Sequence, residues 1–230
     1  MAQPEIRTPA EELVKQHMAA YDPSHDWFHV DRVRRQALKI ARDEKERGAE
    51  VDMEVVEIAA LFHDIGDFKY QKEGDPSGRE IILDFLGKHH FDSRKAELVA
   101  KIVENVSFRK ELAGIKDVWR DTCTELHIVQ DADKLDAIGA FGIMRCAAYS
   151  GFKNRPLYDP NEQAQHNMTY EQYQAQTKAN VGCAISHFHE KLFRLKDMMK
   201  TPSGKAMAQK RHDMMVYFVQ NIEQEYSMDE

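Results

Sequence analysis

The segment from Val55 to Phe62 is apolar on nearly every side of a helix, and His63 and Asp64 follow it directly. A helix that is apolar all round is buried, whereas an aspartate is almost never buried without a partner. An unpaired carboxylate there would cost several kcal/mol or take up a proton. A divalent cation removes this cost, because it binds neutral imidazole together with ionised carboxylate. The pair is therefore a candidate metal site; the competing interpretation is that both side chains only cap the helix.

Apolar residues recur at steps of three and four along most of the chain, and neither strand-like alternation nor an internal repeat is present. The sequence therefore predicts an all-α fold. Gly48 is expected to end one helix and Asp52 to cap the buried one. Residues 1–9 are expected to fray, residues 107–121 are left unassigned, and residues 150–168 are expected to form a long polar loop. Besides the buried segment and a helix starting at Thr122 or Thr124, the expected helices span residues 10–20, 26–47 (capped by Asp22 or Ser24), 79–86 (stopped by Gly87), 93–106, 169–199 and 202–222.

Length and composition limit the class of protein. A chain of 230 residues, 42% of them hydrophobic, fits one domain over residues 1–230, with a metal core at about 22–150 and a C-terminal helical layer at about 169–225. The formal charge of -7 disfavours nucleic acid as a partner. The three cysteines include no CxxC pair, which excludes a thiolate zinc site and favours a reducing compartment. No apolar run approaches the length of a membrane span, so we expect a cytoplasmic protein without a membrane partner.

Two more polar side chains fall on helix faces that are otherwise apolar. His29 lies at the edge of the apolar stripe of the 26–47 helix, and Asp133 lies on the stripe of the helix that begins near Thr124. Asp131 is turned to the far side of that helix, whereas Asp136 shares the inward side, so spacing alone does not separate it from Asp133. Two imidazoles and two carboxylates leave positions open on a six-coordinate ion for water and substrate oxygens.

Three stretches around these residues resemble the metal signature of HD-domain phosphohydrolases, in particular one soluble bacterial and fungal branch. They are SHDWFHVDRV at residues 24–33, LFHDIGD at 61–67 and QDADKLDAIGA at 130–140. The stretch from His187 to Arg211 is also similar to that branch, so the resemblance covers nearly the whole chain. The bare HD pair is moderately specific, and the extended last motif is much more so.

The resemblance implies an all-α fold and hydrolysis of a phosphate ester or anhydride at a bound metal. It implies that the metal ligands are His29, His63, Asp64 and Asp133. A second metal would need an extra pair of histidines, and the adjacent pair His89-His90 sits in no matching motif, so we expect one divalent metal ion. Two histidines and two aspartates suit Mn, Mg, Fe, Co or Ni.

Further residues beside the motifs are candidates for catalysis and substrate binding. Asp67 is placed to hold or deprotonate the attacking water, although it is equally interpretable as a solvent-facing loop acid. Cations are needed to balance charge on the transferring phosphoryl group. His25 is expected to orient a ligand or phosphate, or else only to cap its helix. The candidate cations are Lys69, which we count as catalytic, and Lys134, Arg145 and Arg32, which we count with His25 as substrate-binding.

Members similar to this branch release pyrophosphate from nucleoside triphosphates, so the leading hypothesis is a nucleotide pyrophosphatase acting on nucleoside or deoxynucleoside triphosphates. One alternative is a nucleoside 5′-monophosphate phosphatase. An alternative from another class is a nucleotide-binding regulatory module with a structural metal. The expected partner is a small phosphate compound such as a nucleotide, and a homodimer is left open. No motif specifies the base or the sugar of that nucleotide.

Overall fold

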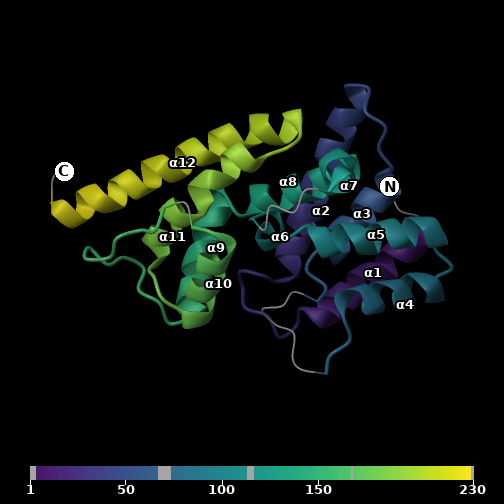
Figure 1. Cartoon of the computed structure of the whole chain (residues 1–230), viewed down its shortest axis with the longest axis horizontal. Coiled ribbons are helices and arrows are strands. Elements are labelled where there is room, and N and C mark those ends of the chain that lie inside the picture. Colours follow the sequence, from purple (N-terminus) through teal and green to yellow (C-terminus); the bar gives the residue numbers. More distant parts are fainter. Residues whose placement is uncertain (1–3, 67–73, 113–116, 167, 229–230) are drawn as a thin grey trace. The chain divides into compact units, whose positions relative to one another are not determined.

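The computed structural model describes residues 4–66, 74–112, 117–166 and 168–228. Every regular element in these ranges is a helix, which confirms the expected all-α class (Figure 1). The chain forms two compact units. The first comprises residues 1–21 and 25–133, and the second comprises residues 22–24 and 134–230.

The first unit is built around the buried helix that the sequence singled out. This helix, α3, lies at Met53–Phe62, and its residues from Val55 to Phe62 are all buried. It packs against α1, α2 and α5, and α4 packs beside α5 (Figure 1). The bounds in this unit are α1 Pro4–His17, α2 Trp27–Glu46, α4 Gly78–Lys88, α5 Ser93–Asn105, α6 Phe108–Leu112, α7 Val118–Thr122 and α8 Thr124–Asp136, of which the last three residues belong to the second unit.

Local signals end α2 and start α3 as expected. Asp52 accepts hydrogen bonds from the backbone of Glu54 and Val55, which caps α3. Gly48 follows α2 with φ +94°, a conformation that favours glycine. The cap of α2 is Asp26, because its carboxylate accepts from the His29 backbone N–H at 2.9 Å; the expected caps, Asp22 and Ser24, were wrong.

A buried ion pair joins α2 to α3. The Nη1 atom of Arg34 lies 2.9 Å from Oε1 of Glu57, and Nη2 lies 2.9 Å from Oδ1 of Asp31. Glu57 has no exposed surface, although its neighbours on α3 are apolar. A buried carboxylate of this kind persists because a guanidinium matches it in charge and geometry. Arg34 and Glu57 therefore link α2 to α3 by a charged contact as well as by apolar packing.

Two helix bounds in the first unit differ from expectation. α1 begins at Pro4, because Ile6, Ala10 and Val14 form a buried stripe that extends the helix through Pro9. α4 runs through Gly87 and ends at Lys88. The left-handed residue after α4 is His90, at φ +55°, rather than a glycine.

The backbone after α3 makes a close approach to the start of α4. A Cβ atom on Gly78 would lie 2.3 Å from the Ile65 carbonyl oxygen, and one on Gly66 would lie 2.6 Å from the Gly78 Cα. Gly66 also has φ +77°, which side chains rarely adopt. Only glycines fit at these two positions, and Ile65 directly follows Asp64.

The second unit contains the remaining helices. Within it, α12 packs against α9 and η1, and α11 packs against α9 and η1. The single helix expected at 169–199 was wrong, because Asn180 and Gly182 have φ +52° and +100° and interrupt it. The bounds are α9 Gly139–Phe152, α10 Tyr170–Ala179, α11 Ala184–Glu190, η1 (a 3₁₀ helix) Leu192–Met198 and α12 Pro202–Ser227.

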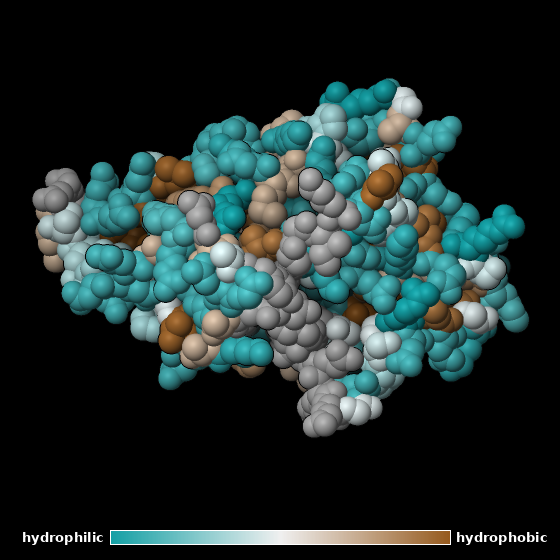
Figure 2. Space-filling view, in the orientation of Figure 1, coloured by the Kyte–Doolittle hydropathy of each residue, from teal (hydrophilic) through white to brown (hydrophobic). Residues whose placement is uncertain are grey.

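The face drawn in Figure 2 is mostly hydrophilic, with scattered apolar side chains. Among the described helices, none combines the length and the apolar character that crossing a membrane requires.

Candidate metal centre

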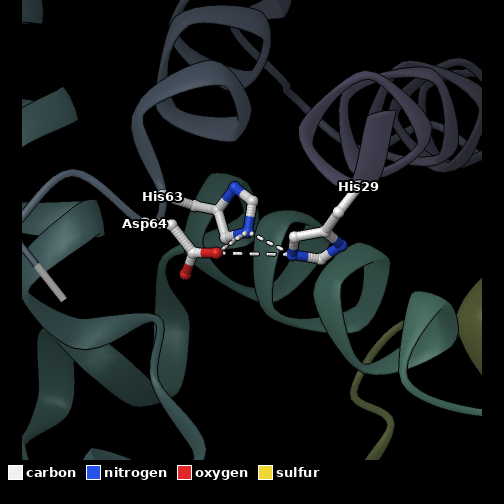
Figure 3. A group of neighbouring side chains, drawn as sticks. All are labelled: His29, His63 and Asp64. Atoms are coloured by element: carbon white, nitrogen blue, oxygen red, sulfur yellow. Dashed lines mark hydrogen bonds and ion pairs between the residues drawn. The ribbon is translucent and has the colours of Figure 1, made fainter. Parts of the chain in front are cut away.

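Three side chains of the first unit converge, and each presents a ligand atom to the others (Figure 3). The Nε2 atoms of His29 and His63 are 3.1 Å apart. Asp64 Oδ2 lies 3.4 Å from the first nitrogen and 3.5 Å from the second. The three ligand atoms all lie within 4.8 Å of one another.

Helix ends position both histidines. His29 is the third residue of α2, and the cap made by Asp26 fixes the first turn that carries it. His63 follows the last residue of α3, and its Nδ1 lies 2.8 Å from the Ala60 carbonyl oxygen. A carbonyl oxygen only accepts, so Nδ1 donates the hydrogen bond and Nε2 of His63 faces the cluster. Orientation of this kind, through the second ring nitrogen, is usual for histidines that bind metals.

Asp64 supplies the clearest physical indication of a cation. Its Oδ2 atom is buried, and within the described part of the chain it receives no hydrogen bond. Burial by itself would raise the pKa of Asp64, but the attraction of His63 and the proximity of His29 outweigh it and hold that pKa well below its usual value. A positive charge beside a buried carboxylate oxygen without a donor stabilises it, and a bound cation would supply that charge.

The spacing of the ligand atoms fits one metal ion. At metal–ligand distances of about 2.1 Å, neighbouring ligands of an octahedral ion lie about 3.0 Å apart and opposite ligands about 4.2 Å apart. The distances among His29, His63 and Asp64 are close to the first value. Asp133, on α8, places Oδ1 at 3.7 Å and 3.8 Å from the two histidine nitrogens, between the two values. The donor set is nitrogen and oxygen without thiolate, which suits Mg, Mn, Fe, Co or Ni.

The structure separates the three aspartates of the last motif. Asp133 lies beside the histidines, and its side chain is 29% exposed. Asp136 is buried and pairs with Arg145, whose Nη1 lies 3.3 Å from its Oδ2. Asp131, which was expected on the far side of α8, is fully buried.

The predicted substrate-binding residues occupy different environments. His25 lies next to His29, with ring centroids 5.9 Å apart in an edge-on arrangement. Arg32 is half-buried on α2. Lys134 is buried and belongs to the second unit. Arg145 is also in the second unit, where its charge is balanced by Asp136. The predicted catalytic residues, Asp67 and Lys69, lie outside the described residues.

Sequence reasoning missed His17, near the end of α1. Its Nε2 atom is buried and makes no hydrogen bond within the described chain. Burial lowers the pKa of His17, and the charges of Asp64 and Asp75 oppose that shift. Asp64 is thus an electrostatic neighbour of His17. A single histidine outside all three motifs gives no sequence signal for this.

Comparison with known proteins agrees with the geometry. The HD domain family matches residues 27–138. The Bacillus subtilis protein YpgQ is 35% identical over 203 residues, which cover 87% of this chain and 84% of YpgQ. A crystal structure of YpgQ in complex with ADP has a TM-score of 0.71 and 29% identity, and covers 95% of this chain and 96% of its own.

Two further solved structures are similar. One, from Lactobacillus plantarum, has a TM-score of 0.78 and 32% identity, with 99% and 100% of the two chains covered. The other is described as an HD-superfamily hydrolase from Bacillus thuringiensis. It has a TM-score of 0.69 and 30% identity, with 96% of each chain covered. On these similarities and on the histidine–aspartate cluster at the end of its buried helix, the chain belongs to the HD domain family.

Proposed function

We propose that this protein is a metal-dependent phosphohydrolase that converts nucleoside or deoxynucleoside triphosphates to the monophosphate and pyrophosphate. The observation that carries the proposal is the buried Oδ2 of Asp64, which receives no hydrogen bond in the described chain and faces two imidazole nitrogens. Such a site recruits a hard divalent ion, and phosphate oxygens are ligands that such ions prefer.

The proposal of a nucleotide substrate rests on the relatives. YpgQ, which resembles this chain over most of its length, has been crystallised with ADP. A site for a nucleoside diphosphate contains room for a base, a sugar and consecutive phosphates. In the proposed reaction, water adds to the α-phosphorus, the bond from that phosphorus to the bridging oxygen breaks, and the bridging oxygen leaves with pyrophosphate.

The roles of the residues follow from their placement. His29, His63, Asp64 and Asp133 would hold the metal, and the exposed side of Asp133 leaves a path for a substrate oxygen. When bound, the metal supplies Lewis-acid chemistry: it polarises phosphate and lowers the pKa of a coordinated water. His63 keeps its lone pair directed at the ion because its other nitrogen donates to the Ala60 carbonyl.

The chain offers further groups for orienting water and balancing phosphate charge. We propose that Asp67 orients the attacking water as an acceptor. Lys69, Lys134 and Arg32 are the proposed cations for the phosphates, and His25, edge-on to His29, is a proposed orienting group.

The test is a product assay on the purified protein with Mn²⁺, Mg²⁺, Co²⁺, Fe²⁺ or Ni²⁺. Nucleoside triphosphates, deoxynucleoside triphosphates and nucleoside 5′-monophosphates are supplied separately, and pyrophosphate and orthophosphate are both measured. Pyrophosphate released in step with monophosphate is the expected result. Orthophosphate from monophosphates alone identifies a 5′-nucleotidase instead.

The control is Asp64→Asn, which keeps the size of the side chain and removes its charge. It should lose both metal and turnover. Tight nucleotide binding without turnover in any metal, by wild-type protein of full metal content, identifies a regulatory module and contradicts the proposal.

A further inference from the structure

Arg145 of α9 makes two buried contacts in the second unit. Its Nε donates to the Ser24 carbonyl oxygen at 2.6 Å, and its Nη1 lies 3.3 Å from Oδ2 of Asp136. The Asp136 side chain is 1% exposed and the Arg145 side chain 12% exposed. The guanidinium thus joins two segments that are more than a hundred residues apart in the sequence.

Both segments continue directly into metal ligands. Ser24 precedes His29 by five residues, with only the Asp26 cap and the first turn of α2 between them. Asp136 follows Asp133 by three residues and lies on the same helix, α8. Arg145 therefore contacts both the segment that leads into the first motif and the end of the helix that carries the last one.

The neighbours of both anchor points are also held. Asp22 Oδ1 accepts from the Ser24 backbone N–H at 2.9 Å and from its hydroxyl at 2.5 Å. Arg211 of α12 donates to the Leu135 carbonyl oxygen, and its side chain packs against Gly139, which has φ +76°. The two segments that Arg145 joins are thus fixed by their own contacts, and Arg145 sets the distance between them.

We propose that Arg145 is a positioning residue: together with Asp136 it clamps the Ser24 carbonyl and thereby fixes the separation of the segments that lead to His29 and Asp133. This inference rests on the proposed function only in taking those two residues as metal ligands. It replaces the direct phosphate contact expected of Arg145 from the sequence, because the planar fork is already committed to a carbonyl and a carboxylate.

The experiment compares metal affinity with substrate kinetics. Arg145→Met alone removes the guanidinium that pairs with the buried Asp136 carboxylate, which endangers folding. The double variant Arg145→Met/Asp136→Asn removes both charges of the pair, and the Ser24 carbonyl loses the Arg145 donor. The matched control is Arg155→Met, which removes an arginine of the same unit whose Nε bonds to Asn180 Oδ1 at 2.8 Å.

For each variant the dissociation constant of Mn²⁺ is measured by calorimetric titration, and kcat and KM for a nucleoside triphosphate are measured at saturating Mn²⁺. The clamp predicts that the double variant binds Mn²⁺ about 10–100-fold more weakly. Its KM at saturating metal should stay within about threefold of wild type, and Arg155→Met should match wild type throughout.

Two results overturn the clamp. An increased KM with unchanged Mn²⁺ affinity makes Arg145 a direct phosphate ligand. A folded double variant with wild-type Mn²⁺ affinity and kinetics limits the pair to a role in folding. If the double variant does not fold, Arg145→Lys decides. Lysine keeps the charge beside Asp136 but cannot hold both partners, so Mn²⁺ affinity should fall again, and wild-type affinity contradicts the proposal. If wild-type protein hydrolyses no nucleotide, the proposed function fails while the Mn²⁺ titration still tests the clamp.

Discussion

The contact between Gly66 and Gly78 allows the metal centre to be perturbed from outside its ligands. In Gly78→Ala, the new Cβ would start 2.3 Å from the Ile65 carbonyl oxygen. An unstrained carbon–oxygen contact is about 3.3 Å, so the two backbones must separate by about 1 Å. Overpacking of this kind costs about 1–3 kcal/mol. Alanine is more favourable than glycine in a helix by only about 0.5–1 kcal/mol, so it offsets only part of this cost.

Gly87→Ala is the matched control, because it makes the same substitution in the same helix, α4. Nothing lies within 4 Å of the position that its Cβ would occupy. The higher helix propensity of alanine should therefore raise the free energy of unfolding of Gly87→Ala by about 0.5–1 kcal/mol, with no clash to oppose it. The two variants should differ by about 1–3 kcal/mol in the free energy of unfolding, with Gly78→Ala the less stable.

The displacement should also reach the metal. Ile65 adjoins Asp64, and a site of this kind tolerates about 0.5 Å of misplacement. We expect Gly78→Ala to weaken Mn²⁺ binding about tenfold, and Gly87→Ala to leave it unchanged. Urea denaturation of the metal-free proteins and calorimetric titration with Mn²⁺ measure the two effects. Equal stability and equal Mn²⁺ affinity of the two variants would refute the reasoning, because the close approach would then have no energetic consequence.

Three other outcomes are expected. Asp64→Ala should abolish both turnover and metal binding. Full activity with unchanged metal content in the purified variant would contradict the assignment of Asp64 as a ligand. Asp52→Ala removes the cap of α3 and should cost about 1 kcal/mol at neutral pH. Burial alone would raise the pKa of Asp52, but the hydrogen bonds from the Val55 N–H and Lys95 outweigh burial and lower that pKa. The stabilisation is thus present above the unfolded pKa and lost as pH falls through the folded one. Denaturation curves for Asp52→Ala and wild type should converge in acid, and a constant difference speaks against the cap. Asp67→Asn should lower kcat about 10²–10⁴-fold with little change in KM, and near-normal steady-state rates would make it an ordinary loop acid.

The parts of the fold that could be predicted are those with local causes. The apolar α3, its cap at Asp52 and the stop at Gly48 are determined within one or two helical turns. The same holds for placing His63 and Asp64 at the end of a buried helix. Helix length was less predictable when tertiary packing outweighed local preference. The buried stripe containing Ile6 carries α1 through Pro9, against the expectation of fraying.

Breaks and long-range partners were not readable from the sequence. The apolar spacing in 169–199 suits a helix, and only the left-handed backbone at Asn180 and Gly182 shows that it is interrupted. Arg145 and Asp136 are nine residues apart and could each be assigned to substrate or metal by spacing. The second partner of Arg145, the Ser24 carbonyl, belongs to the backbone, and sequence patterns of side chains contain no information about it.

The buried pair of Arg34 and Glu57 has a consequence for how this chain can change over generations. Along their helices the two residues lie about 7–9 Å from His29 and His63. Losing one partner of a buried ion pair costs about 3–5 kcal/mol, whereas exchanging both for apolar side chains is often neutral or stabilising. Selection should therefore remove single substitutions at either position. Joint substitutions should persist only where apolar packing alone keeps α2 and α3 together. Across descendants of this sequence, positions 34 and 57 should vary together or not at all.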